Sequence, residues 1–269
     1  MTELSIEELF SVAGRTVLVT GGSRGIGEMI AAGFLANGAK VYISSRKAEV
    51  CDATAERLAA THGGTCVSLP ADLASTAGAE GLAQELAGRE QRLDVLVNNA
   101  GASWGAQLGE FPESGWDKVM DTNVKGVFFL TQALLGLLQA AAAPESPARV
   151  INIGSIDGIR TSRFENWSYG ASKAAVHMLT RQLAATLVGR DILVNAIAPG
   201  PFPTWMLSTG VGGGGDVEGT DWELVGQSNP RGRVGRPSDI AGTALFLASP
   251  AGAFIVGQTI VCDGGVVAV

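Results

Sequence analysis

Short apolar runs rich in β-branched residues alternate along the chain with longer segments in which apolar residues recur every three to four positions. The short runs are typical of strands that are buried on both faces, and the longer segments have the period of helices. Seven strands are predicted, over residues 16–20, 40–43, 65–69, 94–97, 149–153, 192–197 and 258–261. Because a crossover helix fits between successive strands, the pattern predicts an α/β fold with a doubly wound, seven-stranded parallel sheet. Such sheets bind ligands beyond the carboxyl ends of their strands, so functional residues are expected there.

The whole chain, residues 1–269, is predicted to form a single domain, because its length suits one large α/β core and no linker divides it. Residues 201–236 interrupt the regular pattern. This segment has an apolar start, Phe-Pro-Thr-Trp-Met-Leu, and five glycines between positions 210 and 215. We predict a mobile lid over a bound molecule, hinged near Gly200 and within residues 210–215. A disordered insertion is the alternative interpretation.

The charge balance argues against nucleic acid as a main partner. Lys and Arg sum to 19 and Asp and Glu to 26, a net charge of −7, which repels a phosphate backbone. Charged residues make up 17% of the chain, against about 25% in typical soluble domains, so part of the surface is expected to form a subunit interface. The first ten residues lack Lys and Arg, and no apolar run approaches about 18 residues, so no secretory signal and no membrane span are predicted.

Cysteine and histidine are scarce. The three cysteines, Cys51, Cys66 and Cys262, lie far apart, and the histidines are His62 and His177. This spacing gives neither a disulfide framework nor a zinc cluster, so no metal is predicted and a cytoplasmic location is expected. We interpret the cysteines as buried small hydrophobic residues and His177 as a packing or interface residue.

A glycine-rich turn joins the first predicted strand to a helical segment. The turn contains Gly21, Ser23, Arg24, Gly25, Ile26 and Gly27. Glycine permits positive φ and lets the backbone approach a pyrophosphate, whose charge the N-terminus of the helix stabilises. Strand, turn and helix in this order indicate a dinucleotide site. A tight turn without a ligand is the alternative.

The end of the second predicted strand indicates which dinucleotide binds. NAD-binding folds usually carry an Asp or Glu here, whereas this chain has Ser45 and Arg46, with Arg24 lying across from them in the glycine-rich turn. These side chains would bind a 2′-phosphate through charge-assisted hydrogen bonds. The predicted cofactor is therefore NADP(H). The alternative is that Arg46 only begins the next helix on a solvated face.

Candidate catalytic groups follow the middle strands. Tyr169 and Lys173 are one helical turn apart, so their side chains share a face of a predicted helix. A nearby ammonium and an oxidised nicotinamide both favour the phenolate, which would let Tyr169 exchange a proton near neutral pH. Ser155 places a hydroxyl at the end of the fifth strand. Asn123, in a helical stretch over residues 117–142, is expected to bridge a water to Lys173.

Together, the glycine-rich turn, the sequence Asn-Asn-Ala-Gly after the fourth strand, Ser155 and the Tyr-x-x-x-Lys pair resemble the short-chain dehydrogenase/reductase family. The resemblance covers residues 15–265. It implies a Rossmann-type fold, an NADP(H)-dependent oxidoreductase that needs no metal, and a homotetramer. Further short runs are similar to an NADPH-dependent β-ketoacyl reductase branch of the family; they lie at residues 103–106, 115–120, 147–155 and 197–203.

The resemblance implies roles for the matching residues. Tyr169 is implied to be the general acid in reduction, and Ser155 to hold the substrate carbonyl oxygen. Lys173 is implied to lower the pKa of Tyr169 and, like Tyr169, to contact the cofactor, while Asn123 supports a proton relay. Gly21, Gly25 and Gly27 are implied to hold the pyrophosphate. The other implied cofactor contacts are Asp72 and Leu73 at the adenine, Asn98, Ala100 and Gly101 around its ribose, and Pro199, Gly200, Phe202 and Thr204 at the nicotinamide carboxamide.

The predicted substrate is a small apolar carbonyl or alcohol compound, with 3-oxoacyl thioesters as candidates. A sugar or polyol dehydrogenase is the alternative among enzymes. A non-catalytic dinucleotide sensor is the alternative from another class, although a sensor would be free to lose Tyr169 or Lys173 and this chain keeps both. Trp104, Trp167 and Trp205 are expected to line one apolar pocket, with ordinary packing as the alternative.

Overall fold

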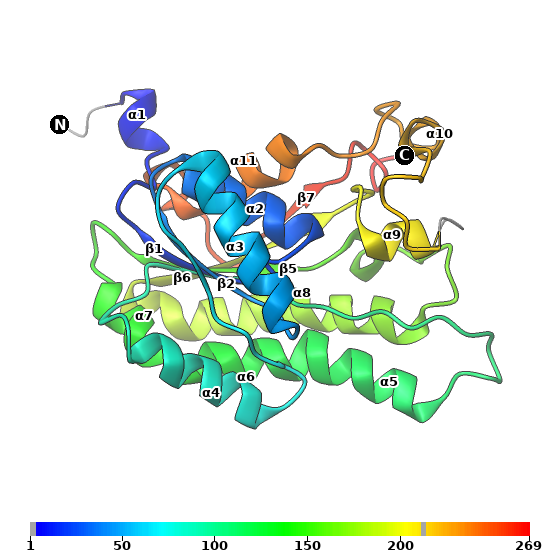
Figure 1. Ribbon diagram of the computed structural model, residues 1–269, viewed down its shortest axis with the longest axis horizontal. Coiled ribbons are helices and arrows are strands. Elements are labelled where there is room, and N and C mark those ends of the chain that lie inside the picture. Colours follow the sequence, from blue (N-terminus) through cyan, green and yellow to red (C-terminus); the bar gives the residue numbers. More distant parts are fainter. Residues whose placement is uncertain (1–3, 211–213) are drawn as a thin grey trace.

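Seven parallel strands form one sheet in the order β3-β2-β1-β4-β5-β6-β7 (Figure 1). The computed structural model describes residues 4–210 and 214–269. The strands are β1 (Thr16–Thr20), β2 (Lys40–Ser44), β3 (Cys66–Ser68), β4 (Val95–Asn98), β5 (Ala148–Ile153), β6 (Ile192–Pro199) and β7 (Thr259–Cys262). The prediction of a doubly wound, seven-stranded parallel sheet is confirmed.

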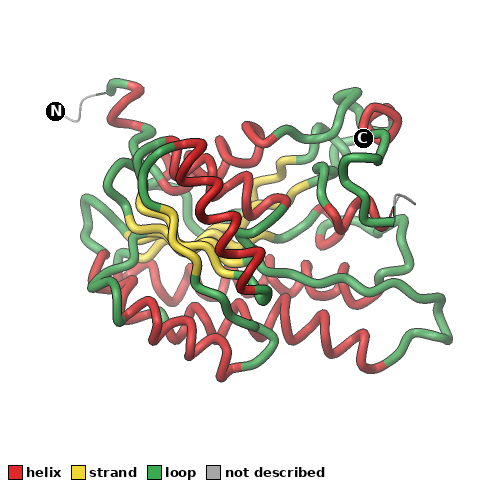
Figure 2. The backbone as a smooth tube through the Cα atoms, viewed as in Figure 1, coloured by secondary structure: helices red, strands yellow, loops and turns green. Residues whose placement is uncertain are grey.

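Helices cover both faces of the sheet, as Figures 1 and 2 show. One layer consists of α2 (Gly25–Ala36), α3 (Ala48–His62) and α11 (Pro237–Ala248). The other layer consists of α4 (Thr76–Ala87), α5 (Glu113–Met120), α6 (Gly126–Ala133), α7 (Leu135–Ala141) and α8 (Trp167–Leu187). The inner strands therefore bury apolar side chains on both of their faces, whereas the edge strand β7 leaves Val261 39% exposed.

Strand β1 shows how the sequence produces this arrangement. Val17 and Val19 pack in the core cluster formed with α2, α3 and α11, whereas Leu18 between them packs in the cluster formed with α4, α6 and α8. All three side chains are fully buried. The chain passes from β1 to β2 on one side but returns to β4 on the other, so the sheet reverses its winding between β1 and β4. The carboxyl ends of these two strands are where such sheets bind ligands.

The helical stretch expected over residues 117–142 is interrupted in the structure. Helix α5 is followed by a π-helical turn, Asp121–Lys125, which leads directly into α6, and a break at Leu134 separates α6 from α7. Asn123 lies within the π-helical turn. Turns of this kind change the direction in which a helix presents its side chains and occur often at functional sites.

Residues 201–236 contain two short helices, α9 (Trp205–Gly210) and α10 (Trp222–Gln227). They lie together over the carboxyl edge of the sheet, on the right in Figure 1. Residues 211–213, where part of the predicted hinge falls, lie outside the described residues. A further helix that the sequence pattern did not predict, α1 (Ile6–Leu9), begins at the N-cap Ser5.

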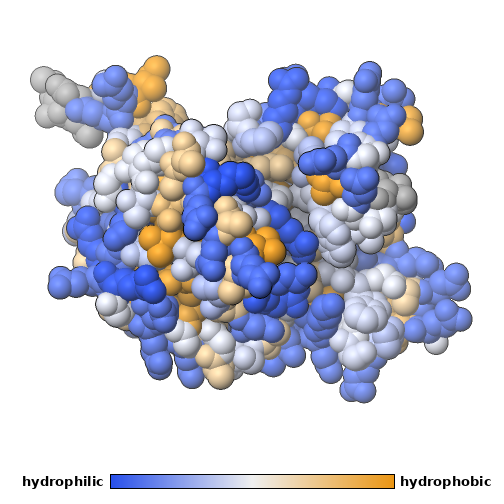
Figure 3. Space-filling model, viewed as in Figure 1, coloured by the Kyte–Doolittle hydropathy of each residue, from blue (hydrophilic) through white to orange (hydrophobic). Residues whose placement is uncertain are grey.

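The face of the molecule in Figure 3 is largely hydrophilic, with apolar side chains in small separate spots. Within residues 4–210 and 214–269, no single helix is both long and apolar enough to cross a membrane. One bent helix pair, residues 113–141 with a bend of 56°, reaches the required length and composition together. Cys51 is buried as expected, whereas Cys66 and Cys262 are half-buried, and all three thiols are free.

Candidate active site

The turn between β1 and α2 requires glycine at three of its positions, Gly21, Gly25 and Gly27. Gly21 and Gly25 have φ values of +63° and +57°, a region that side chains with a Cβ rarely adopt. A Cβ atom at Gly27 would overlap the carbonyl oxygen of Gly21 and the side-chain amide of Asn99. These positions therefore have no side chain near the N-terminus of α2, where free N–H groups and the helix dipole favour the binding of an anion. This geometry fits the pyrophosphate of a dinucleotide.

Asn99 holds the glycine-rich turn against β4, a role that the sequence reasoning missed. Its side-chain amide donates to the carbonyl oxygens of Thr20 (2.9 Å) and Gly21 (3.2 Å). The hydroxyl of Thr20 accepts in return from the backbone N–H groups of Asn99 (2.9 Å) and Ala100 (3.0 Å). The Asn-Asn-Ala-Gly sequence was the available signal, and it was interpreted only as a cofactor contact.

Asn98, predicted beside the ribose, uses its side chain elsewhere. Its amide donates to Thr131 (3.1 Å) and to the amide oxygen of Asn152 (2.9 Å), and Asn152 in turn donates to Thr180 (2.9 Å). All four side chains are buried. This chain of hydrogen bonds joins β4, β5, α6 and α8 beneath the catalytic edge and occupies the side-chain Nδ2 of Asn98, whose contact with the ribose stays a prediction.

Two backbone hydrogen bonds bring the ends of β1, β2 and β3 to one corner. The N–H of Gly22 donates to the carbonyl of Ser44 (3.2 Å), and the N–H of Ala71 donates to the carbonyl of Ser45 (3.1 Å). The corner gathers the residues that the sequence assigned to the adenosine half of the cofactor, namely Ser23, Arg24, Ser45, Arg46, Asp72 and Leu73. The Arg46 side chain is exposed there and available to a 2′-phosphate.

The three expected groups for proton transfer meet at the carboxyl end of β5. Ser155 lies two residues beyond the end of the strand and is buried, and its hydroxyl accepts from the N–H of Asp157 (3.1 Å). Lys173 is also buried, donates from Nζ to the carbonyl of Ile153 (2.8 Å), and lies 5.5 Å from the ring centre of Tyr169. A hydroxyl, a phenol and an ammonium therefore line one site.

Asn123 joins this site through Ser172, which the sequence reasoning also missed. The Asn123 amide donates to the Ser172 hydroxyl (2.9 Å), and that hydroxyl donates to the backbone carbonyl of Tyr169 (2.7 Å). The amide also exchanges two hydrogen bonds with the backbone of Ala102. The Asn123 side chain therefore bonds directly to protein groups. The sequence had led us to expect a water between it and Lys173. Asn123 thereby fixes the backbone of α8 at Tyr169.

Burial controls the proton affinities in the site. Desolvation raises the pKa of Tyr169 to about 12, opposed by the Ser155 hydroxyl, and it lowers the pKa of Lys173 to about 8. Without ligands, burial therefore affects the pKa of Tyr169 more than the Lys173 charge does. The pKa is raised, whereas the sequence led us to expect a lowered value. At neutral pH Tyr169 is protonated, the form that a proton donor requires.

We predict that Lys173→Met stabilises the protein while abolishing turnover. Because the pKa of Lys173 is lower in the folded than in the unfolded chain, its buried charge destabilises the fold below pH 8. The gain in unfolding free energy should be about 1–3 kcal/mol at pH 7, and it should shrink as pH rises from 8 towards 10.5. Denaturant unfolding across this pH range measures it. Lys125→Met, at an exposed ion pair with Asp121, is the control and should change stability little; an equal effect there would refute the prediction.

His177 packs against the strand that carries Ser155. It is buried, Nε2 has no hydrogen-bond partner, and a Cβ atom at Gly154 would overlap that nitrogen. Burial, together with the Lys173 charge, lowers the pKa of His177 to about 4 despite a hydrogen bond with the backbone of Gly158. His177 is therefore neutral and is a packing residue, as interpreted from the sequence.

The three tryptophans expected in one pocket make separate contacts. Trp167 lines an apolar cavity of about 340 Å³ together with Phe111 and Trp116, and its Nε1 donates to a backbone carbonyl (3.0 Å). Trp104 lies under the Lys118 ammonium, 5.2 Å from it. Trp205 stacks on Arg24. Each of the three indoles therefore has a different partner.

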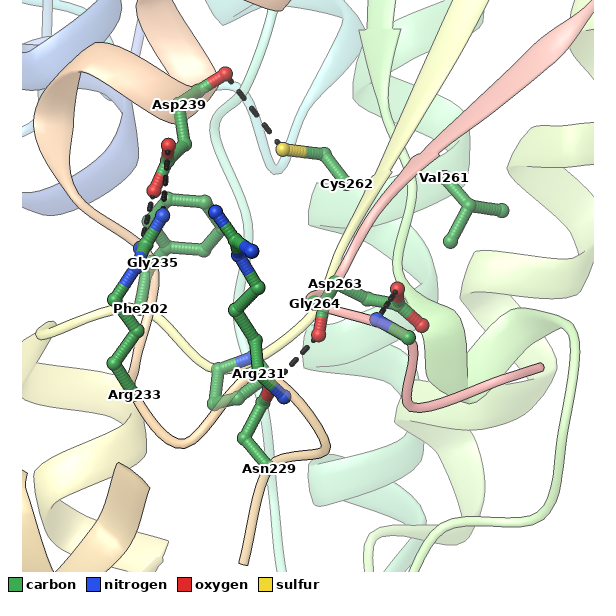
Figure 4. A pocket seen from close by; sticks show the side chains of 12 residues that line it. Phe202, Asn229, Arg231, Arg233, Gly235, Asp239, Val261, Cys262, Asp263 and Gly264 are labelled. Atoms are coloured by element: carbon green, nitrogen blue, oxygen red, sulfur yellow. Dashed lines mark hydrogen bonds and ion pairs between the residues drawn. The ribbon is translucent and has the colours of Figure 1, made fainter. Parts of the chain in front are cut away.

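A cavity of about 410 Å³ lies beyond the end of β7 (Figure 4). Arg233 pairs there with Asp239 (2.6 Å), and the ring of Phe202 lies beneath Gly235. Phe202 belongs to the core, and its role at the nicotinamide carboxamide stays a prediction. Thr204, two residues later, places its methyl group against Gly25, which brings the start of α9 onto the glycine-rich turn. This cavity contains neither Tyr169 nor Ser155 and is separate from the catalytic groups.

The remaining predicted cofactor residues lie along the same edge. Gly101 approaches Asn123 and the Lys173 ammonium, since a Cβ atom there would lie 3.5 Å from Oδ1 and 3.7 Å from Nζ. Gly200, next to Pro199, donates to the carbonyl of Cys262 (3.0 Å) at the end of β7. Ile26 lies in the first turn of α2 and packs against the core. In the described part of the chain, no group of three or more His, Cys, Asp or Glu side chains is placed to hold a metal ion.

Comparison with known proteins identifies the family. A family model described as enoyl-(acyl carrier protein) reductase matches residues 21–267, nearly the whole chain. The chain belongs to the short-chain dehydrogenase/reductase family. The rhamnolipid biosynthesis 3-oxoacyl-(acyl-carrier-protein) reductase of Pseudomonas aeruginosa is 52% identical over 256 residues, which cover 95% of this chain and 97% of that protein.

Solved structures of short-chain dehydrogenases/reductases agree. The RhlG/NADP active-site complex of Pseudomonas aeruginosa superposes with a TM-score of 0.88 and 52% identity, over 96% of this chain and 98% of that one. A gluconate 5-dehydrogenase of Burkholderia cenocepacia, solved with NADP and tartrate, gives a TM-score of 0.86 at 32% identity, over 98% and 100%. The family, its oxidoreductase class and the resemblance to a rhamnolipid-associated β-ketoacyl reductase, all inferred from sequence, are confirmed.

Proposed function

We propose that the chain is an NADP(H)-dependent carbonyl reductase or alcohol dehydrogenase that acts on 3-oxoacyl thioesters. One observation carries the chemistry: Ser155, Tyr169 and Lys173 meet at the carboxyl edge of the sheet that also carries the glycine-rich turn. A proton donor and a dinucleotide cradle therefore share one edge. The thioester is supported by 52% identity, over nearly the full length of both chains, to a 3-oxoacyl-(acyl-carrier-protein) reductase.

The proposal assigns a role to each of these side chains. Ser155 donates a hydrogen bond to the substrate carbonyl oxygen, and Tyr169 transfers its phenolic proton to the same oxygen. NADPH, when bound, supplies the hydride that reaches the carbonyl carbon. Lys173 binds the nicotinamide ribose and stabilises the phenolate left on Tyr169, because an adjacent ammonium favours that charge. Asn123 keeps α8 in place through Ser172.

NADP(H) as cofactor is supported by the corner that holds Arg24, Ser45 and Arg46. The two structural relatives described above bind NADP. A sugar dehydrogenase is the second candidate, favoured by the likeness to gluconate 5-dehydrogenase. A non-catalytic sensor has less support, because Tyr169 and Lys173 occupy one site with Ser155.

The test is a panel of carbonyl substrates followed by NADPH absorbance. We expect a 3-oxoacyl thioester to give the highest kcat/KM, above keto-sugar acids, ketoses and cyclic ketones. A sugar or keto-acid as the best substrate would favour the sugar dehydrogenase. No turnover of any compound, together with tight NADPH binding, would favour the sensor.

We also propose a homotetramer in the cytoplasm. Large apolar side chains remain exposed along α5, α6 and α8, namely Trp116, Phe128, Trp167 and Met178. A monomer would leave these apolar side chains in water, whereas pairing of the same helices from two copies, the first step towards a tetramer, would bury them. The free thiols are in keeping with a reducing compartment.

We propose that residues 201–236 act as a lid, and we predict that their amides exchange hydrogen quickly in the free protein and more slowly in a ternary complex. The reason is that closure orders solvated backbone only when ligands supply contacts for it. Hydrogen exchange measured by mass spectrometry, with and without NADPH and substrate, gives the answer. Amides of β5 serve as an internal reference and should be protected in both states. Equal protection of the lid in both states would show a static loop.

A further inference from the structure

Arg24 and Trp205 connect two parts of the chain that lie far apart in the sequence. Arg24 is the N-cap residue of α2 in the glycine-rich turn, and Trp205 begins α9. The guanidinium carbon of Arg24 lies 4.9 Å from the centre of the Trp205 ring. A cation over an indole face at this distance is attracted by the ring. The lid segment therefore touches the nucleotide site directly.

The indole is held in place from behind by the same segment. Gly215, at φ +89°, lies so close to the indole nitrogen that a Cβ atom there would overlap it. The fully buried hydroxyl of Ser208 bonds to the carbonyl of Asp216 (3.0 Å) and to the Thr220 hydroxyl (2.7 Å), which ties α9 to this turn. These contacts join the indole, α9 and the following turn into one unit, which meets Arg24 as a whole.

The hydrogen-bond donors of Arg24 are unused beside Trp205. A guanidinium carries five N–H donors in its plane, in an arrangement that matches a phosphate. Among the described residues, Arg24 makes no side-chain hydrogen bond or ion pair, and its side chain contacts the Trp205 ring. Since Gly22 is bonded to Ser44, the turn that carries Arg24 adjoins Ser45 and Arg46.

Core packing does not account for Trp205. The side chain is 47% exposed, although indoles usually gain more from burial. The contact of its ring with Arg24, which has no other side-chain partner among the described residues, indicates that Trp205 positions this cation. A long, free Arg side chain would lose rotamer freedom on binding a phosphate, and prior stacking reduces that loss.

We propose that Trp205 is a positioning residue for cofactor selection, which orients Arg24 so that its free edge meets the 2′-phosphate of NADP(H). The inference rests on the proposed assignment of Arg24 to that phosphate. Residues 201–236 would then contribute to the preference for NADP(H) over NAD(H). Loss of the indole affects only the dinucleotide that carries the 2′-phosphate.

The experiment measures dissociation constants of NADPH and NADH, by fluorescence titration, for the full-length protein and five variants. Trp205→Ala should weaken NADPH binding about 2–5-fold, the size expected for a partly exposed cation–π contact, and leave NADH unchanged. Trp205→Phe, which keeps an aromatic face, should restore most of the NADPH affinity. Arg24→Ala should weaken NADPH by about tenfold or more, and adding Trp205→Ala to it should cause no further loss.

A matched control separates positioning from general loosening of the segment. Trp222 lies in the same segment and donates its indole N–H to the carbonyl of Val217 (2.7 Å), away from Arg24. Trp222→Ala should leave the ratio of the two dissociation constants unchanged. An equal loss of NADPH and NADH affinity in Trp205→Ala, additive effects in the double variant, or the same ratio change in Trp222→Ala would each overturn the inference.

The outcomes also separate this inference from the proposed function. If Arg24→Ala keeps full discrimination, the assignment of Arg24 fails and the inference fails with it. If Arg24→Ala loses discrimination but Trp205→Ala does not, the assignment stands and only the role of Trp205 is refuted. The identity of the carbonyl substrate affects neither measurement.

Discussion

Tyr169→Phe is expected to lower kcat by about 10²–10⁴-fold, the range in which a positioned acid contributes to catalysis. The substitution removes one hydroxyl and keeps the ring, so folding and NADPH affinity should stay close to those of the unaltered protein. The phenol is protonated at neutral pH because burial raises its pKa to about 12. Single-turnover and steady-state kinetics on the best substrate measure the loss.

Tyr42→Phe is the matched control, since Tyr42 is the one other tyrosine of the chain. Its hydroxyl donates to Glu90 (2.7 Å) far from the catalytic edge. This variant should lose about 1 kcal/mol of stability with kcat unchanged. Ordinary turnover by Tyr169→Phe would remove Tyr169 from the mechanism and strengthen the sensor interpretation.

Arg46→Asp should weaken NADPH binding by about 100-fold, because it removes a charged hydrogen bond of roughly 1.5–3 kcal/mol and adds repulsion of the 2′-phosphate. NADH binding should change little or improve, since an acid at this position can accept from the ribose 2′-hydroxyl. Dissociation constants of both dinucleotides, measured at two salt concentrations, test this. The NADPH loss should be smaller at high salt.

Lys47→Asp is the control for Arg46→Asp, because it changes the charge by the same amount at the neighbouring position. A direct contact predicts a large effect at Arg46 and a small one at Lys47. Equal effects would indicate only the general field of a solvated helix start. Unchanged preference in both variants would place the 2′-phosphate elsewhere.

The sheet was predictable because its inner strands are buried on both faces. Their sequences are short, continuous apolar runs, which differ from the helical pattern of the segments between them. Strand β1 was predicted with its exact ends, and β7 lies one residue further on than predicted. The π-helical turn that contains Asn123 was not predictable, since the apolar spacing on either side suits a continuous helix. Its hydrogen-bond register depends on what α5 and α6 pack against.

The candidate site was predicted as a set of residue types, but their hydrogen-bond partners were not. Asn98, the last residue of β4, and Asn99, which follows the strand, are the same residue type but make different contacts. Only the register of the sheet decides that Asn98 enters the buried network and that Asn99 holds the glycine-rich turn. The stack of Arg24 on Trp205 joins distant segments, so no local pattern announces it.

The contact between Gly154 and His177 couples two positions across the boundary between strand and helix. Because a methyl group at 154 would occupy the space of the imidazole, a homologue with Ala or Ser at 154 must carry a smaller side chain at 177. The two positions should therefore covary, although neither performs chemistry. In directed evolution, a library that adds a side chain at position 154 alone would contain few folded members. A library that also reduces the side chain at position 177 would contain more of them, and the loop after β5 could then be varied.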